Sequence, residues 1–403
     1  MKLKVLHVIP SVSEQSGGPA QAIFPMCRAL RARGHEVAIA TTSHGLSGLN
    51  GNGKGLKLYN GTATHFFPVQ WGDAFKYSRP LQSWLDENVR RFDVVHIHAV
   101  FNHSSIAAAR SCRKYLVPYV VRPLGTLDPW SMQQKSLRKS LFWTLAGRRM
   151  LKRAGTIHYT AQAEFDLVKD SLGLTEGSVV PLGIESSATV LGPQASSPAR
   201  APNTDCDLRG QARTPAVPGP TGPYVLFLSR LHPKKGLDVL LNAFFELHKN
   251  QMFSEWCLVI AGDGEAAYVN SLKRLVSLNA ADDFVRFVGW VSGEEKCDVL
   301  RNASLLVLPS RQENFGLCVL EALAEGVPVV VSRDVNLAKD IADARAGWIS
   351  SIDVVGLENT LSEAMANKEQ RLKRGLAGKA FSQNFSWESV AEKLESMYLS
   401  IVD

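Results

Sequence analysis

The stretch that decides the fold is residues 303–332, which reads ASLLVLPSRQENFGLCVLEALAEGVPVVVS. The apolar runs Leu305–Leu308 and Val327–Val331 at its two ends are each typical of a buried strand. A helical segment joins them, and two strands joined by a helix form a parallel βαβ unit. The helix therefore begins, near Asn314 to Gly316, at the carboxyl ends of the strands, where open α/β sheets bind ligands.

Two glutamates lie eight residues apart in this stretch, Glu313 before the helix and Glu321 within it. Helical spacing surrounds Glu321 with apolar side chains on both faces of the helix. A buried carboxylate needs a partner, because an unpaired one costs several kcal/mol. Hydroxyl groups of a bound sugar or ribose could be that partner. A structural ion pair with a lysine or arginine is an equally good interpretation of an isolated buried glutamate.

The chain has two successive series of alternating strands and helices. Its 403 residues exceed the size at which a single hydrophobic core stops growing. The two series predict an α/β protein with two doubly wound, Rossmann-like domains that face each other across a cleft. The first series predicts strands at Lys4–Ile9, Glu36–Thr41, Ala63–Val69, Val94–His98, Val117–Val121, Thr156–Thr160 and Val179–Leu182. The second predicts strands at Tyr224–Leu228, Cys257–Ala261, Val285–Val288, Leu305–Leu308 and Val327–Val331.

A stretch rich in proline, serine and alanine separates the two series. It holds six prolines and no aromatic residue, so it has too little apolar surface to order itself. The predicted organisation is an N-terminal domain (1–185), a flexible linker (186–222), a C-terminal domain (223–378) and a C-terminal helix that packs back on the N-terminal domain (379–403).

Positive charge is concentrated in the N-terminal half. Residues 1–185 hold 23 Lys and Arg against 12 Asp and Glu, whereas the remainder holds 22 against 26. An anionic surface or substrate is therefore expected at that half. Nucleic acid is not an expected partner, because no nucleic-acid-binding motif accompanies the charge. The six cysteines form no CxxC pair, which predicts reduced thiols rather than a disulfide framework or a zinc site.

Loops that follow the predicted strands carry glycines and cations suited to a phosphate. Gly17 and Gly18 open the first helix, where free backbone N–H groups carry partial positive charge. Arg230 and Lys235 follow the first strand of the second series and could bracket a diphosphate. Gly262 follows the next strand. Ordinary turns and solvated surface are the alternative for these loops. Neither glycine loop has the GxGxxG spacing of a dinucleotide-binding oxidoreductase.

Two histidines, His96 and His98, end a buried strand of the first series. Strand alternation puts their side chains on the same side, with His98 nearer to the cleft. Strand-end histidines are more often satisfied structural residues than ligands. No third ligand is spaced to join the pair, so the sequence predicts no metal site.

These motifs together resemble the retaining glycosyltransferases of family 4, also called glycosyl transferases group 1, which have the GT-B architecture. The resemblance covers nearly the whole chain, and its most specific part is the E-x7-E motif with Phe-Gly and Glu-Ala, from Glu313 to Ala322. It implies a nucleotide-diphosphate sugar bound to residues 223–378 and a glycan acceptor on the side of residues 1–185. One departure is Leu182, where many relatives have Asn, and it puts one loop contact in doubt.

The resemblance implies a role for each matching residue. Glu313 would contact hydroxyls of the donor sugar, Glu321 the ribose, and His98 would lie beside the transferred sugar. Arg230 and Lys235 would hold the diphosphate. The implied catalytic residues are Glu313, His98, Arg230 and Lys235. The implied donor-binding residues are Gly17, Gly18, Arg230, Lys235, Gly262, Glu313, Asn314, Phe315, Gly316, Leu317 and Glu321.

The function so implied is transfer of a sugar, with retention, to a lipid-linked glycan in cell-surface polysaccharide synthesis. No cofactor and no metal ion are expected. One alternative is a GT-B enzyme of another kind, either a synthase with a soluble sugar-phosphate acceptor or a nucleotide-sugar epimerase. A second is a non-catalytic subunit that binds sugar nucleotides, and a third is a peripheral membrane adaptor, which would leave the motifs unexplained.

A basic segment without acidic residues extends from Pro129 to Ala163. Such a segment could lie on an anionic membrane and bring a polyprenyl-linked acceptor to the cleft, and a solvated helix face is the alternative. No apolar run is long enough to span a bilayer. The predicted location is therefore the cytoplasm, with the inner face of the cell membrane as the alternative if the basic segment binds it. On one continuous helix, the following side chains fall within an arc of about 100°: Lys135, Arg138, Lys139, Phe142, Arg149 and Arg153.

Overall fold

The computed structural model describes residues 1–13, 16–46, 55–128, 131–132, 142–185 and 222–402. The predicted linker, apart from Gly222, lies outside the described residues. So do three positions of the predicted basic face, Lys135, Arg138 and Lys139.

An eight-stranded sheet forms the N-terminal domain, with strand order β3-β4-β2-β1-β5-β6-β7-β8. Neighbouring strands are parallel except for β3, which pairs antiparallel with β4 at one edge. The strands are β1 (Lys4–Ile9), β2 (Glu36–Thr42), β3 (Gly55–Tyr59), β4 (Thr62–Phe67), β5 (Val94–His98), β6 (Tyr119–Arg122), β7 (Thr156–Tyr159) and β8 (Ser178–Val179).

A six-stranded, fully parallel sheet forms the C-terminal domain, with strand order β11-β10-β9-β12-β13-β14. From β9 the chain adds strands in one direction along the sheet, and from β12 it adds them in the opposite direction. In doubly wound sheets, ligands bind beside such a switch point, beyond the carboxyl ends of the strands. The strands are β9 (Tyr224–Leu228), β10 (Cys257–Ala261), β11 (Val285–Gly289), β12 (Leu305–Leu308), β13 (Val329–Ser332) and β14 (Gly347–Ser350).

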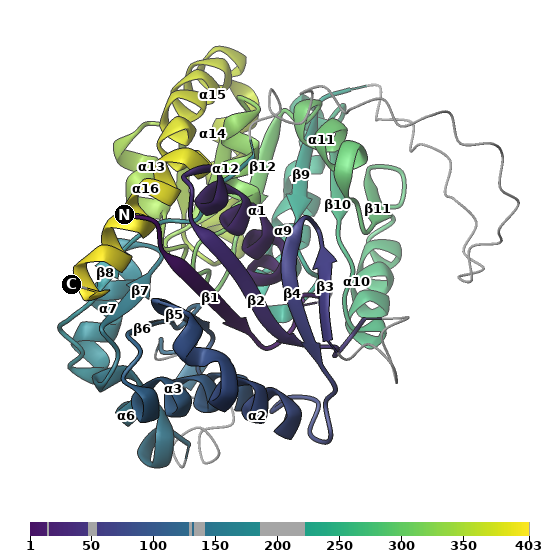
Figure 1. Cartoon of the computed structure of the whole chain (residues 1–403). Coiled ribbons are helices and arrows are strands. Elements are labelled where there is room, and N and C mark those ends of the chain that lie inside the picture. Colours follow the sequence, from purple (N-terminus) through teal and green to yellow (C-terminus); the bar gives the residue numbers. More distant parts are fainter. Residues whose placement is uncertain (14–15, 47–54, 129–130, 133–141, 186–221, 403) are drawn as a thin grey trace, which may run out of the picture.

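Helices connect the parallel strands in both domains (Figure 1). Those of the N-terminal domain are α1 (Gly18–Ala32), α2 (Arg79–Asn88), α3 (His103–Tyr115), α6 (Arg148–Lys152) and α7 (Gln162–Leu172). Those that follow are α9 (Leu237–His248), α10 (Ala266–Leu278), α11 (Gly293–Arg301), α12 (Leu317–Ala324), α13 (Ala338–Asp343), α14 (Val354–Ala366), α15 (Lys368–Ser382) and α16 (Trp387–Val402). None of these helices is long and apolar enough to cross a bilayer.

The central strands are buried because helices cover both faces of each sheet. Every residue of β5, β9, β12 and β13 is buried. Parallel strands covered on both faces read as continuous apolar runs rather than alternating ones, which is why the sequence reveals them. The prediction of two doubly wound, Rossmann-like domains is confirmed.

The last helix, α16, packs on the N-terminal domain rather than on the domain that precedes it in sequence. It lies against α1, and both chain termini are close to it in Figure 1. The Tyr398 hydroxyl reaches His96 of β5 at 2.8 Å, and Arg33 after α1 forms an ion pair with Glu395 at 2.5 Å. A Cβ on Gly155 would lie 3.0 Å from Ile401. Helix α16 therefore ties the two domains together.

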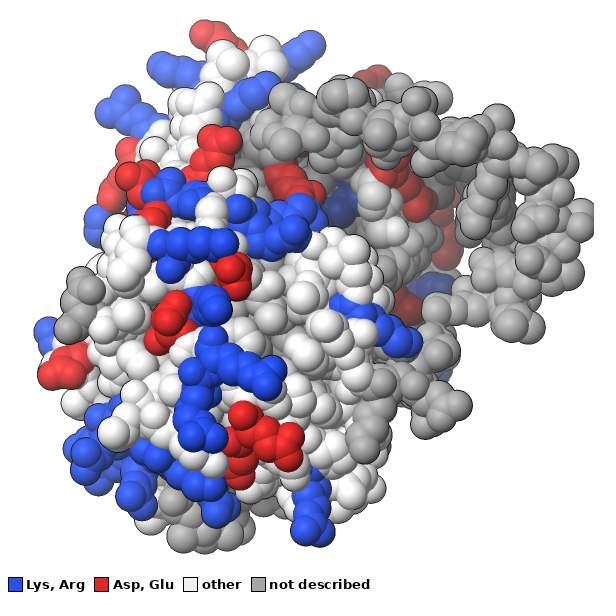
Figure 2. Space-filling model, in the orientation of Figure 1, with Lys and Arg blue, Asp and Glu red and all other residues white. Residues whose placement is uncertain are grey.

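The described part of the basic segment is not one uninterrupted α-helix. A π-helical turn, Trp143–Gly147, precedes α6. The wider π turn rotates the residues that follow it, so the arc predicted for a continuous α-helix does not extend across it. Arg149 and Arg153 are exposed. Figure 2 shows Lys and Arg side chains gathered at the lower left, in the region of α6 and α3.

Candidate active site between the domains

Three loops of the C-terminal domain converge at the switch point because glycines let their backbones approach. Gly236 has φ +68°, and a Cβ there would lie 2.1 Å from the carbonyl oxygen of Pro309. Gly262 has φ +142°, and a Cβ there would lie 1.9 Å from the carbonyl oxygen of Ser229. Only glycine avoids both the backbone strain and the collision. The loops after β9, β10 and β12 are therefore held against one another.

The N-terminus of α12 points into the same place. Its N-cap, Gly316, adopts the left-handed conformation with φ 74° and ψ 59°. The N–H groups of the first turn have no partner within the helix and carry partial positive charge. This end of the helix is therefore suited to an anion such as a phosphate.

A pocket of about 400 Å³ lies between the two domains at this point. Its lining from the N-terminal domain is Ser16, Gly17, Gly18, Pro19, Gln21, Arg122, Leu124, Gly125, Thr126 and Leu182. Its lining from the C-terminal domain is Leu228, Ser229, Arg230, Lys234, Lys235, Ala261, Gly262, Trp290, Val291, Lys296, Gln312, Glu313, Asn314, Phe315, Gly316, Leu317, Cys318 and Glu321. The structure thus brings all the predicted donor-binding residues together, whereas His98 is not among them.

Each glutamate of the E-x7-E motif forms an ion pair with a lysine from another loop. Lys235 donates a hydrogen bond to Glu313, and Lys296 donates to Glu321 at 2.6 Å. Burial raises the pKa of Glu313, but the neighbouring Lys235 ammonium outweighs that effect and holds the pKa below its ordinary value. The Glu321 and Lys296 side chains keep 25% and 24% of their surface exposed. The pair therefore remains accessible from the pocket.

Arg230 is the exposed cation of the pocket. Its side chain forms no ion pair with any described residue, in contrast to Lys235 and Lys296. It lies against the N-terminal domain, since a Cβ on Gly17 would be 3.4 Å from its Nε atom. A guanidinium in this position can form a bidentate contact with an anionic ligand held between the domains.

A buried carboxylate of the N-terminal domain orders the loops that meet α12. Glu164 accepts hydrogen bonds from the backbone N–H groups of Gly125 and Thr160, both at 2.8 Å, and from the Thr160 hydroxyl at 2.9 Å. Asn314 donates to that hydroxyl at 2.8 Å and so bridges the two domains. A Cβ on Gly125 would lie 2.7 Å from the Asn314 side chain, so glycine permits this contact.

The structure corrects the placement of His98. Its imidazole is fully buried and shares a hydrogen bond of 2.9 Å with His7 of β1. His96 lies beside it with ring centroids 4.3 Å apart, and His158 bonds to His96 at 3.2 Å. Strand alternation did place His96 and His98 on one side, but α16 covers that side through Tyr398. His98 therefore faces the interior of the N-terminal domain and not the pocket.

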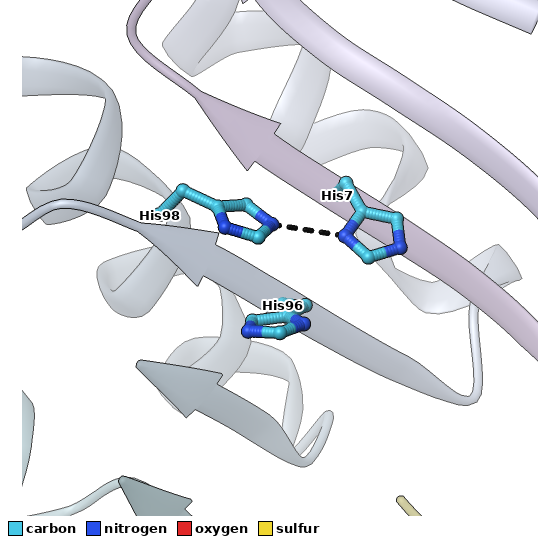
Figure 3. Close-up of side chains that lie close together, drawn as sticks. All are labelled: His7, His96 and His98. Carbon is cyan, nitrogen blue, oxygen red and sulfur yellow. Dashed lines mark hydrogen bonds between the residues drawn. The ribbon is translucent and has the colours of Figure 1, made fainter. Parts of the chain in front are cut away.

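The neighbouring strands also supply the third histidine that sequence spacing does not reveal. β1 and β5 are adjacent and parallel, and His7 pairs in register with His96. One ring nitrogen from each of His7, His96 and His98 lies within 4.8 Å of the others, a spacing that could hold a metal ion (Figure 3). Burial and the nearby Arg122 guanidinium lower the pKa of His7 to about 3. The neutral rings suit a metal, whereas that guanidinium opposes a second cation.

Two charged residues that line the pocket, Lys296 and Arg122, escaped the sequence interpretation, as did Glu164, which holds the neighbouring loops. Lys296 lies in an ordinary charged helix, and its pairing with Glu321 depends on how α11 packs beside α12. Arg122 is 2% exposed at the end of β6, and its Nε atom has no hydrogen-bond partner among the described residues. A charged residue directly after a predicted buried strand was the available signal for Arg122.

Two family models match successive parts of the chain. Residues 17–183 match the glycosyl transferase 4-like domain, and residues 222–368 match glycosyl transferases group 1. This chain belongs to the group 1, family 4-like glycosyltransferases. A curated relative of this glycosyltransferase is the D-inositol 3-phosphate glycosyltransferase of Corynebacterium efficiens, 32% identical over 177 residues, which are 43% of this chain and 42% of the relative. The chain spans about half the length, or less, of the curated relatives that it matches.

Solved structures with the same fold align over the whole glycosyltransferase. Sucrose-phosphate synthase from Thermosynechococcus elongatus aligns with a TM-score of 0.74 and 20% identity, over 98% of each chain. Anabaena Alr3699/HepE in complex with UDP and glucose aligns with a TM-score of 0.71 and 16% identity, over 98% of this chain and 99% of that one. At these identities the likeness establishes the GT-B fold.

Proposed function

We propose that this glycosyltransferase moves a sugar, with retention of the anomeric configuration, from a nucleoside diphosphate sugar bound in the interdomain pocket. The observation that carries the proposal is the convergence of Arg230, Lys235 and Lys296 with the N-terminus of α12 in one pocket. Such a group of positive charges fits a diphosphate, and the carboxylates of Glu313 and Glu321 fit hydroxyl groups. The complex of HepE with UDP and glucose supports a donor of this class.

The chemical step needs a leaving group that is stabilised by fixed charges. The bond from the anomeric carbon to the diphosphate oxygen breaks, and a bond to the acceptor oxygen forms. The acceptor proton passes to the departing phosphate oxygen. Arg230, Lys235 and the α12 N-terminus stabilise the negative charge that develops on that phosphate. These groups neutralise the diphosphate, so we propose that turnover requires no divalent metal ion and no cofactor.

The acceptor is either a lipid-linked glycan or a soluble sugar phosphate. The sequence-based expectation is a polyprenyl-linked glycan in cell-surface polysaccharide synthesis, with the protein resting on an anionic membrane. The exposed Arg149 and Arg153 support that proposal. The second candidate is favoured by Arg122, a buried guanidinium that lines the pocket and suits a phosphate, because its Nε has no hydrogen-bond partner in the described part of the chain. The name of the Corynebacterium relative also favours a phosphorylated acceptor.

A transfer assay in the presence of EDTA tests the proposed reaction. UDP-, GDP- and ADP-sugars are supplied with inositol phosphate, fructose 6-phosphate, or polyprenyl-linked sugars extracted from bacterial membranes. We expect one donor to release its nucleoside diphosphate only when an acceptor is present. NMR of the product should show the anomeric configuration of the donor. An inverted product contradicts retention, and activity only after Mg²⁺ is restored contradicts metal-independent catalysis.

Replacing Arg230 by alanine should lower kcat/KM by about 10- to 100-fold, because a charge-assisted contact to the leaving diphosphate is lost. Arg274→Ala is a matched control, since Arg274 is an exposed arginine of α10 outside the pocket. Steady-state kinetics on both variants makes the comparison. Equal effects of the two substitutions would mean that Arg230 is ordinary solvated surface.

A further inference from the structure

A second pocket, of about 480 Å³, lies on the N-terminal domain. Its volume falls within the range of about 300–1,000 Å³ that is usual for small-molecule sites. The residues that line it come directly after two strands, β2 and β4, at the carboxyl ends of both. Those after β2 are Ser43, His44 and Gly45, and those after β4 are Pro68, Val69, Gln70, Trp71 and Asp73. The β1–α1 loop, which lines the donor pocket, leaves the same edge of the sheet. The two pockets therefore lie along one edge.

A row of serine hydroxyls in the β1–α1 loop separates the two pockets. Ser16, which lines the donor pocket, shares a hydrogen bond of 3.0 Å with Ser13. Ser11 bonds to Ser13 at 3.2 Å and donates to the carbonyl oxygen of His44, in the second pocket, at 2.9 Å. A ligand that fills the second pocket therefore lies across one loop from the donor.

An aromatic platform forms one wall of the second pocket. Trp71 is 60% exposed, although it is a large apolar side chain. Its ring stacks on Tyr77 with centroids 5.1 Å apart and on Phe75 with centroids 5.9 Å apart. Trp71 and Tyr77 also form a β-bridge, which fixes the backbone of the platform. A single exposed apolar side chain needs no explanation in a soluble protein. The Trp71 indole differs, because two neighbouring rings and a β-bridge hold it in place beside a polar pocket.

We propose that this Trp71 pocket binds a neutral sugar ring of the acceptor glycan. The inference rests on the proposed function and favours a glycan over a small sugar phosphate. One face of a pyranose ring presents C–H groups, which pack on a rigid aromatic face, while hydroxyl groups at its edge can bond to Asp73 and Gln70. No Lys or Arg is among the described residues that line this pocket, which favours a neutral ligand over a phosphate.

Saturation-transfer NMR tests the proposal with neutral trisaccharides as probes: maltotriose, cellotriose and triacetylchitotriose, each with excess UDP to fill the donor pocket. We expect saturation of ring protons in at least one probe. Trp71→Ala should weaken the binding of that probe at least tenfold, and Trp71→Phe should retain most of it. Leu58→Ala, at an exposed position on β3, should leave the binding unchanged.

Two results would overturn the Trp71 pocket as a sugar site. One is the absence of saturation for all three probes in the parent protein, and the other is equal binding by the parent and by Trp71→Ala. Melting temperatures of the variants with UDP-, GDP- and ADP-sugars report on the donor pocket separately. If the parent protein shows a donor response but binds no trisaccharide, this inference alone fails, whereas a missing donor response in the parent protein fails the proposed function.

Discussion

Glu313→Gln should lower kcat by about 10²–10³-fold while the protein stays folded. Glutamine keeps the size of the side chain but removes the charge that pairs with Lys235. Without that charge, Lys235 loses the contact that aims its ammonium into the pocket, and the sugar hydroxyls lose a strong acceptor. Because both effects act on the reacting centre, kcat should change more than the affinity for the donor.

Glu325→Gln is the matched control for this prediction. Glu325 caps the far end of α12, pairs with Arg301 at 3.2 Å and does not line the pocket. Steady-state kinetics and melting curves on both variants make the comparison. A Glu313→Gln enzyme with near-normal turnover would remove Glu313 from the catalytic machinery. Equal losses in the two variants would indicate a general effect of altering a carboxylate beside either end of α12.

Acid should unfold this protein steeply, because a cluster of four histidines, His7, His96, His98 and His158, is fully buried as neutral rings. Burial, together with the charge of Arg122, lowers the pKa of His7 and of His158 to about 3. Burial and neighbouring positive charges also lower the pKa of His96 and His98. The unfolded state therefore binds more protons below about pH 6.5, and stability present above that pH is lost as the pH falls. The slope is about 1.4 kcal/mol per pH unit for each histidine.

Chemical denaturation between pH 4 and 8 measures this slope. With four coupled histidines, the free energy of unfolding should be flat above about pH 7 and fall by several kcal/mol per unit below about pH 6. His7→Asn should reduce the slope of the acid limb by the contribution of one histidine, about 1.4 kcal/mol per pH unit. A stability profile that stays level down to pH 5 would show that these rings are not held neutral by the fold.

Strand positions were largely predictable because parallel strands are continuous apolar runs. The predicted Lys4–Ile9, Val94–His98 and Tyr224–Leu228 coincide with β1, β5 and β9. β3 escaped because it is an exposed edge strand without an apolar run. Its signal was the turn Asn60-Gly61, whose φ values of 45° and 72° are those of a tight hairpin.

The site was predictable where motif and topology agree, and not where partners come from distant segments. The motif and the βαβ topology together placed the two E-x7-E glutamates near the N-terminal end of a helix that faces the cleft, and both line the pocket. Their lysine partners depend on how separate loops pack. His98 was misplaced because alternation gives the side of a strand, but not what covers that side. Here α16, from the other end of the chain, covers it through Tyr398.

Calorimetric titration of nucleotide sugars tests the central claim most directly. UDP-, GDP- and ADP-sugars are titrated into the parent protein, Glu321→Gln and Glu325→Gln. One donor should bind the parent at a single site with a Kd below about 1 mM. Glu321→Gln should weaken that binding at least tenfold, about 1.4 kcal/mol, and Glu325→Gln should leave it unchanged. The absence of binding by all three donor classes, or equal affinity in Glu321→Gln, would contradict the assignment of the interdomain pocket as the donor site.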